Sequence, residues 1–167
     1  MEVTIKQAET TEAPIIANLL ELYMHDFSLF SNVEVGEDGR FGYAYLEHYW
    51  RDPDRFPLLI LAEKKLAGFA LLRIETDPGD GSKTMDLAEF FVLRQFRRQR
   101  VGSQAAAKIW DLFPGRWRLR VLVSNHTAYA FWEKLVGDYC KRKFEADDEK
   151  GFLGDLKRFS FTSGSGG

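Results

Sequence analysis

Residues 97–102 (RRQRVG) combine positive charge with a glycine where a helical pattern begins. A helix N-terminus leaves backbone N–H donors unpaired and carries partial positive charge, so it attracts phosphate oxygen atoms. Gly102 lets the backbone approach a ligand closely. Arginines stand at positions 94, 97, 98 and 100. The segment therefore predicts a polyphosphate site, although the same residues would also suit a solvated helix start.

The elements on both sides of this loop are those needed to position it. Residues 84–93 (TMDLAEFFVL) predict a largely buried strand, because they are rich in aromatic and aliphatic side chains. After the loop, apolar residues recur at helical spacing until Pro114 and Gly115 end the pattern. Strand, basic loop and helix thus follow in the order that a ligand site at a helix N-terminus requires.

Glu89 is the best candidate for a general base. It lies on the predicted strand, where alternation places Leu87 and Phe91 on its own face. Such an apolar setting disfavours the charged carboxylate and raises its pKa toward 7. We therefore predict that Glu89 accepts a proton in catalysis. The alternative is an ion pair with one of the many arginines.

Together, the loop and residues 125–132 (NHTAYAFW) resemble the acyl-coenzyme A site of GNAT-type N-acetyltransferases. In that family an Arg/Gln-x-x-Gly-x-Gly/Ala loop holds the pyrophosphate of acetyl-CoA. The first Arg and the last Gly match, whereas Arg100 replaces the usual first Gly, and we expect its backbone to keep helical or bridge geometry. The resemblance implies cofactor contacts from Arg97, Arg98, Gln99, Arg100, Val101, Gly102 and Ser103.

The resemblance also implies roles in the second motif. Asn125 corresponds to an Asn that contacts the pantetheine arm, although Asn also suits a helix N-cap. Seven residues later the family commonly has a Tyr that protonates the departing thiolate, and the indole of Trp132 cannot do so. We therefore predict that Trp132 contacts the cofactor, and that Tyr129, which carries the nearest phenol, is the candidate general acid. The helical stripe predicts core positions at Ala128, Phe131, Trp132 and Leu135.

Thioester recognition, by the same resemblance, uses backbone N–H groups of Phe91, Val92 and Leu93 that a β-bulge leaves without sheet partners. These groups would bind the pantetheine amide and polarise the acyl oxygen. The implied reaction is direct transfer from acetyl-CoA to an amine, without a covalent enzyme intermediate.

Acceptor binding is expected at the end of the first predicted helix, where Tyr23, His25 and Asp26 are candidate ligands. Acidic residues at positions 34, 37 and 38 follow and favour a cationic acceptor. No metal is expected, because three scattered histidines do not form a metal site. A CoA-binding module without turnover stays an alternative, since the first loop Gly and the acidic Tyr are both replaced.

Whole-chain properties fit one compact domain. With 45% hydrophobic residues the chain can bury a core, and we predict one domain over residues 1–162 and a Gly/Ser tail at 163–167. The single Cys140 excludes a disulfide framework and favours the cytoplasm. The sequence contains no apolar run long enough to predict a membrane span. The net charge of −2 argues against nucleic-acid binding, and the oligomeric state stays open between monomer and homodimer.

The expected fold is α/β, with helices flanking a mostly antiparallel mixed sheet that contains one splayed parallel pair, similar to the GNAT fold. Strands are predicted at residues 3–8, 57–63, 66–75, 84–93, 116–123, 139–145 and 157–161. Helices are predicted at residues 10–23, 43–50, 101–113 and 126–136, with Thr10 or Thr11 as the first cap. Residues 146–150 are expected to form a polar loop.

Overall fold

The structure, a computed structural model, describes residues 1–164 and contains one seven-stranded sheet. Its strands are β1 (Val3–Gln7), β2 (Arg55–Ala62), β3 (Lys65–Thr76), β4 (Lys83–Val92), β5 (Gly115–Leu122), β6 (Phe144–Gly151) and β7 (Gly154–Ser163). Its α-helices are α1 (Ala13–Phe27), α2 (His48–Arg51), α3 (Val101–Leu112) and α4 (His126–Tyr139), with short 3₁₀ turns η1 (Thr10–Glu12) and η2 (Arg94–Phe96). The strand order is β1-β2-β3-β4-β5-β7-β6, and the parallel pair is β4–β5. The predicted fold class is confirmed.

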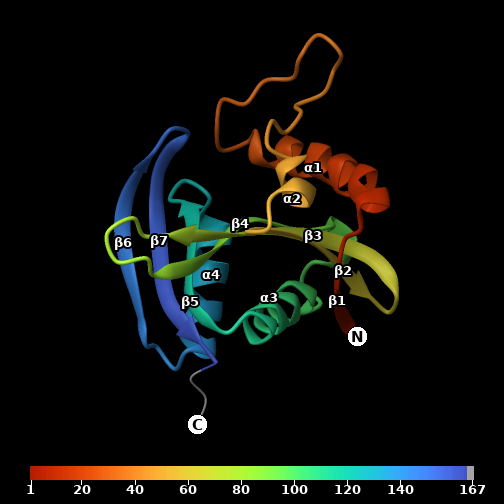
Figure 1. Cartoon of the computed structure of the whole chain (residues 1–167). Helices are drawn as coiled ribbons and strands as arrows, with labels where there is room; N and C mark the ends of the chain where they lie inside the picture. Colours follow the sequence, from red (N-terminus) through yellow and green to blue (C-terminus); the bar gives the residue numbers. More distant parts are fainter. Residues whose placement is uncertain (165–167) are drawn as a thin grey trace.

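Helices cover both faces of the sheet (Figure 1). Helices α1 and α2 lie on one face over β2 and β3, whereas α3 and α4 lie on the other. Apolar side chains of α1 and α2 pack on Phe69 and Phe91. On the opposite face, Trp110 of α3, Trp117 of β5 and Phe159 of β7 are fully buried. The two cores lie on opposite faces of β2, β3 and β4. Within residues 1–164, no helix combines the length and the apolar character needed to cross a membrane.

Strands β4 and β5 separate soon after they meet. Across the described residues they pair at three positions, from Met85–Trp117 to Leu87–Leu119. Beyond Leu87 the edge of β4 that faces β5 has no strand partner, because the chain crosses over through α3 before returning as β5. This splay opens backbone groups of β4 next to the N-terminus of α3.

A β-bulge at Ala88 sets the orientation of the next side chains. Leu72 pairs with Leu87 and Leu71 pairs with Glu89, so Ala88 is the extra residue of β4. Asp86 and Glu89, three positions apart, would lie on opposite faces of a regular strand. The bulge places both on the face covered by α1 and α2. The prediction that Leu87 shares the face of Glu89 is therefore wrong, whereas Phe91 does share it.

Several element boundaries also differ from prediction. Residues 146–150, expected to be a loop, belong to β6, because Asp147, Asp148 and Glu149 form ion pairs with basic residues of β7. Ser163, assigned to the tail, ends β7, and its hydroxyl accepts the Trp117 indole N–H at 3.0 Å. Residues 165–167 of that tail lie outside the described residues.

At the other end of the chain, the expected Thr cap is wrong, since Thr10 and Thr11 lie within η1 and the backbone N–H of Glu9 donates to Glu12. The second helix, expected at 43–50, is shorter and begins at His48. The carboxylate of Glu21 accepts the N–H groups of Phe41 and Gly42, and Gly42 has a φ of +70°. The chain therefore enters this segment through turns rather than a helix.

Candidate active site

The N-terminus of α3 has the geometry of an anion site. Its first intrahelical bond runs from the N–H of Gln104 to the carbonyl of Arg100, at 3.0 Å. The N–H groups of Val101, Gly102 and Ser103 therefore lack acceptors within the helix. A Cβ atom added to Gly102 would lie 3.4 Å from the ring of Phe131, so the glycine brings α3 close to α4. Arg98 and Arg100 are exposed beside this helix start.

Arg100 is in the left-handed region, with φ 64° and ψ 9°. The expectation of helical or bridge geometry is wrong. The backbone at position 100 has the conformation that favours glycine, although this chain has an arginine there. Arg98 has a positive φ as well, 59°. The basic loop therefore holds strain that the sequence alone does not show.

Replacing Arg100 by Gly should stabilise the protein. A left-handed conformation costs an L-residue roughly 1–2 kcal/mol, whereas the flexibility of Gly in the unfolded chain costs about 0.4–1 kcal/mol. We expect a gain of about 0.5–1 kcal/mol in the free energy of unfolding, measured by urea denaturation. Gln99→Gly is the control, because Gln99 has no positive φ, and it should lose stability. A loss of stability in Arg100→Gly would contradict the inference that the backbone of Arg100 is strained.

Arg97 and Asp26 bind each other. The Nη2 of Arg97 lies 2.7 Å from the carboxylate of Asp26, and its Nε donates to the carbonyl of Val92 at 2.8 Å. Arg94 pairs with the other oxygen of Asp26 at 2.5 Å. Burial alone would raise the pKa of Asp26, but the hydrogen bonds from Arg97 and Arg94 outweigh it and lower the pKa. These contacts fasten the end of α1 to the end of β4.

This pairing shows what two of the predicted site residues contact. Both carboxylate oxygens of Asp26 are paired with arginines, so the structure gives Asp26 a positioning role, and its contact with an acceptor stays a prediction. The guanidinium of Arg97 is turned toward α1 and lies 5.5 Å from the Phe91 ring centroid, away from the free N–H groups of α3. His25 is exposed, and its carbonyl accepts the Ser28 hydroxyl.

The edge of β4 offers fewer free N–H groups than predicted. Leu93 N–H donates to the carbonyl of Ala67 at 2.8 Å, so it has a sheet partner. Phe91 pairs with Phe69, and alternation along an antiparallel strand directs its N–H toward β3 as well. Val92 and Phe90 direct their N–H groups to the splayed side. Of the three residues predicted for thioester recognition, Val92 is the one whose N–H faces the opening.

Asn125 is the N-cap of α4, with its side-chain oxygen accepting the N–H of Ala128 at 3.1 Å. Its amide NH₂ group stays available as a donor. Trp132 is buried, 8% exposed, and its ring meets Phe90 of β4 at 5.1 Å between centroids. Phe131, predicted to be core, is 36% exposed next to Gly102. Tyr129 packs on Phe159 of β7, at 6.0 Å between ring centroids.

Glu89 has the environment expected of a general base. The hydroxyl of Tyr43 donates a hydrogen bond to a carboxylate oxygen of Glu89, 3.1 Å away, and the hydroxyl of Tyr23 lies beside the same carboxylate. Burial raises the pKa of Glu89 to about 7, and the negative charge of Asp86 adds to this effect. The two tyrosines and Arg73 oppose it by stabilising the charged form. Near neutral pH, Glu89 can therefore exist in both protonation states.

Asp86 is the centre of an arginine cluster on the same face. Its side chain is 3% exposed and lies 2.8 Å from Arg73, 3.1 Å from Arg120 and 3.7 Å from Arg118. A cavity of about 350 Å³ opens between this cluster, Glu89 and Tyr43. Sequence reasoning missed the cluster, because only the bulge at Ala88 brings Asp86 to the face of Glu89. The alternating arginines of residues 116–120 were the available signal.

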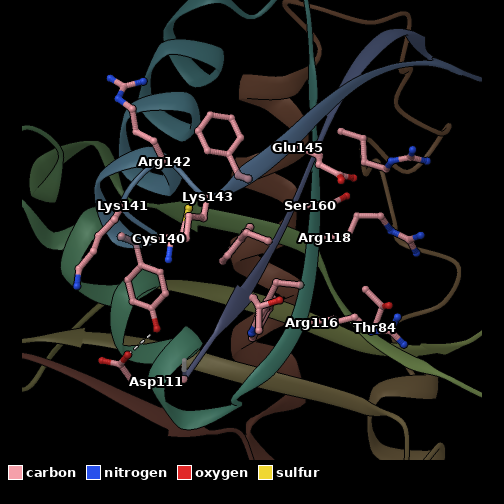
Figure 2. A pocket seen from close by; sticks show the side chains of 17 residues that line it. Thr84, Asp111, Arg116, Arg118, Cys140, Lys141, Arg142, Lys143, Glu145 and Ser160 are labelled. Carbon is pink, nitrogen blue, oxygen red and sulfur yellow. Dashed lines mark hydrogen bonds between the residues drawn. The ribbon is translucent and has the colours of Figure 1, made fainter. Parts of the chain in front are cut away.

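A larger cavity, about 1260 Å³, lies at the other end of the sheet (Figure 2). Lys141, Arg142 and Lys143 stand on one side of it, and Arg116 and Arg118 on the other. Tyr139 donates a hydrogen bond to Asp111 there, at 2.7 Å. Neither Glu89 nor the N-terminus of α3 lines this cavity. The smaller cavity is therefore the one that adjoins the candidate base.

A sequence model described as the acetyltransferase (GNAT) family matches residues 16–137, well over half of the chain. The chain belongs to this family. Its enzyme class, acetyl-CoA-dependent N-acetyltransferase, confirms the prediction. No curated protein sequence matches the chain significantly.

Solved structures of low sequence identity share the fold of this GNAT chain. An acetyltransferase from Thermus thermophilus has a TM-score of 0.69 and 16% identity, with 97% of each chain covered. The spermidine N-acetyltransferase of Vibrio cholerae, solved with CoA and spermine, has a TM-score of 0.64 and 18% identity, covering 96% of this chain and 95% of that one. Arabidopsis thaliana Naa50, solved with a bisubstrate analogue, has a TM-score of 0.62 and 18% identity, covering 96% and 99%.

Proposed function

We propose that this GNAT protein transfers an acetyl group from acetyl-CoA directly to the primary amine of a small molecule, with Glu89 as the general base. One observation carries the proposal. Glu89, with a pKa of about 7, lines a small cavity on the same stretch of β4 where the sheet splays open. A base of this pKa is suited to removing a proton from an ammonium group near neutral pH.

The donor side of the proposed site is formed by three elements. The free N–H groups at the start of α3 bind the pyrophosphate, with Arg98 and Arg100 adding positive charge. Val92 N–H contacts the pantetheine arm along the splayed edge of β4, and the amide NH₂ of Asn125 contacts it from α4. The acyl group then lies between β4 and β5, beside the cavity of Glu89.

Transfer proceeds by attack of the neutral amine on the thioester carbonyl. Glu89 takes the proton that the ammonium group loses, directly or through a water molecule. The N–C bond forms, the C–S bond breaks, CoA leaves as the thiolate, and the second proton of the attacking nitrogen passes to this thiolate or to water. Because an ordinary thiol has a pKa of about 8.5, this thiolate departs without an obligatory acid. Tyr129, packed on β7, is therefore not required in this scheme, and Trp132 serves to position Phe90.

Two observations support a small acceptor. The cavity volume, about 350 Å³, is near the lower end of the roughly 300–1000 Å³ typical of small-molecule sites. Tyr43 and Tyr45, from the segment before α2, line it and limit its extent. The neighbour from Vibrio cholerae is a spermidine N-acetyltransferase, which is an example of a small amine acceptor in this fold.

The test measures acceptor-dependent release of free thiol from acetyl-CoA across a panel of small amines, alongside CoA binding by calorimetry. We expect CoA binding and thiol release that rises with acceptor concentration. CoA binding without thiol release from any amine would instead identify a binding module, the alternative that the replaced loop Gly and acidic Tyr raise.

A further inference from the structure

The cavity beside Glu89 contains a buried hydroxyl without a partner. Tyr49 of α2 lines the cavity and is 2% exposed, and within residues 1–164 its hydroxyl has no hydrogen-bond partner. Buried polar groups in folded proteins are almost always satisfied, so an exception calls for an explanation. Burial raises the pKa of Tyr49, so this hydroxyl keeps its proton and is a donor. The hydroxyl is therefore available to donate to a hydrogen-bond acceptor of a bound ligand.

The surroundings of this hydroxyl contain several arginines. Arg55 places its guanidinium 5.3 Å from the Tyr49 ring centroid, and Arg73 and Arg120 line the same cavity. Apart from Glu89, Asp86 is the carboxylate that lines this cavity, and it is shared by Arg73, Arg120 and Arg118.

Other carboxylates that pair with these arginines stand outside the cavity. Asp52 lies 3.4 Å from Arg55, Glu75 lies 3.0 Å from Arg73, and Glu149 lies 2.8 Å from Arg120. None of the three lines the cavity. The wall away from Glu89 therefore presents guanidinium groups to the cavity, whereas most of the carboxylates that balance their charge lie outside it.

The acidic segment expected to attract cations lies away from this cavity. Glu34 and Asp38 line a different cavity, of about 640 Å³, between α1 and the segment before α2. Glu37 is exposed and lines neither cavity. The sequence-based preference for a cationic acceptor is therefore not supported at the position of the candidate base.

We propose that the acceptor is a small amine that carries a carboxylate near its amino group, as an amino acid does. The carboxylate accepts hydrogen bonds from the Tyr49 hydroxyl and the guanidinium groups of Arg55 and Arg73, while the amine faces Glu89. Guanidinium groups bind carboxylates with paired, charge-assisted hydrogen bonds. This assignment rests on the proposed acetyl transfer.

Matched acceptors that differ by one carboxylate test the assignment. Ornithine with putrescine, lysine with cadaverine, histidine with histamine and tyrosine with tyramine form such pairs, and thiol release gives kcat/KM for each member. We expect at least one pair in which the amino acid is preferred about ten-fold or more, as one good charged contact would give. Turnover of the amines without carboxylates at equal or higher kcat/KM in every pair would overturn this assignment and leave the acetyltransferase intact. Absence of thiol release with every one of these amines would overturn both this assignment and the proposed acetyl transfer.

Tyr49→Phe separates recognition from structure. Removing an unpartnered buried hydroxyl should leave the melting temperature unchanged or raise it. The preference for the amino acid over its decarboxylated partner should fall at least five-fold. Tyr45→Phe is the matched control, because Tyr45 lines the same cavity but is 61% exposed, and it should keep the preference. An unchanged preference in Tyr49→Phe, or an equal loss for both members of the pair, would refute the carboxylate contact.

Discussion

Glu89→Gln is expected to lower kcat by about 10²–10⁴-fold, the usual contribution of a general base. The amide keeps the size of the side chain and still accepts a hydrogen bond from Tyr43, but it cannot take a proton from the ammonium group. Affinity for CoA should stay the same, because Glu89 is on the opposite face from the N-terminus of α3. Steady-state kinetics and calorimetry provide the two measurements.

The pH dependence makes this test more specific. Glu89 acts only when deprotonated, so the rate of the parent enzyme should rise with pH and level off above its pKa of about 7. In Glu89→Gln this acid limb should disappear. Glu47→Gln, with an exposed side chain that pairs with Arg51, is the control and should keep both the rate and the limb. An unaltered profile in Glu89→Gln would remove Glu89 from the mechanism.

Whereas the rate of the parent enzyme should rise with pH, its stability should fall. The folded-state pKa of Glu89, about 7, exceeds its ordinary value of 4.5. Between these two pH values the folded protein holds a proton that the unfolded chain has lost, so the free energy of unfolding falls as pH rises. The full contribution is up to about 3 kcal/mol. Relative to the parent, Glu89→Gln should therefore be more stable at pH 8 than at pH 4, which urea denaturation at both pH values would measure.

Asp86→Asn is expected to have the largest effect on stability. It removes the buried carboxylate shared by three partly exposed arginines and leaves their charges facing one another. Breaking a buried ion pair by removing one partner typically costs about 3–5 kcal/mol. Asp147→Asn is the control, since Asp147 is 51% exposed and pairs with Arg158 at 3.2 Å, and it should cost under about 1 kcal/mol. Equal losses in the two variants would contradict the role of the cluster.

The same substitution should shift the acid limb of activity. The negative charge of Asp86 helps to raise the pKa of Glu89, and Arg73 lowers it. Without Asp86, the arginines stabilise the ionised Glu89, so the limb should move below pH 7. A limb that stays in place in folded Asp86→Asn would show that the two carboxylates are not coupled.

Most of the element order was predictable because hydrophobic periodicity is local. The pattern of residues 101–113 predicted α3, and the alternation of residues 116–123 predicted β5. Residues 146–150 were mispredicted because their side chains are polar and charged. They form a strand because the cross-strand ion pairs to Lys157 and Arg158 involve residues that the local pattern does not include.

Some features of the candidate site could be predicted from the sequence, and others could not. Glu89 was identified from its type and its apolar neighbours, and the anion site from the glycine and the helix start. The pairing of Asp26 with Arg97 was not, because the two residues are 71 positions apart in the chain. A side chain with a charged partner near in space cannot be told from a free one by sequence.

The sequence by itself determined the family, the order of strands and helices, the position of the basic loop before α3 and the identity of the candidate base. These depend on residue type and short-range spacing, which the chain carries locally. The tertiary structure decided what surrounds that base. The bulge at Ala88 turns Asp86 and Glu89 to one face, α2 places Tyr49 there, and β3 and β5 add the arginines. Burial and charge pairing arise only when these distant segments pack together, and they give Glu89 its raised pKa and the cavity its arginine-lined wall.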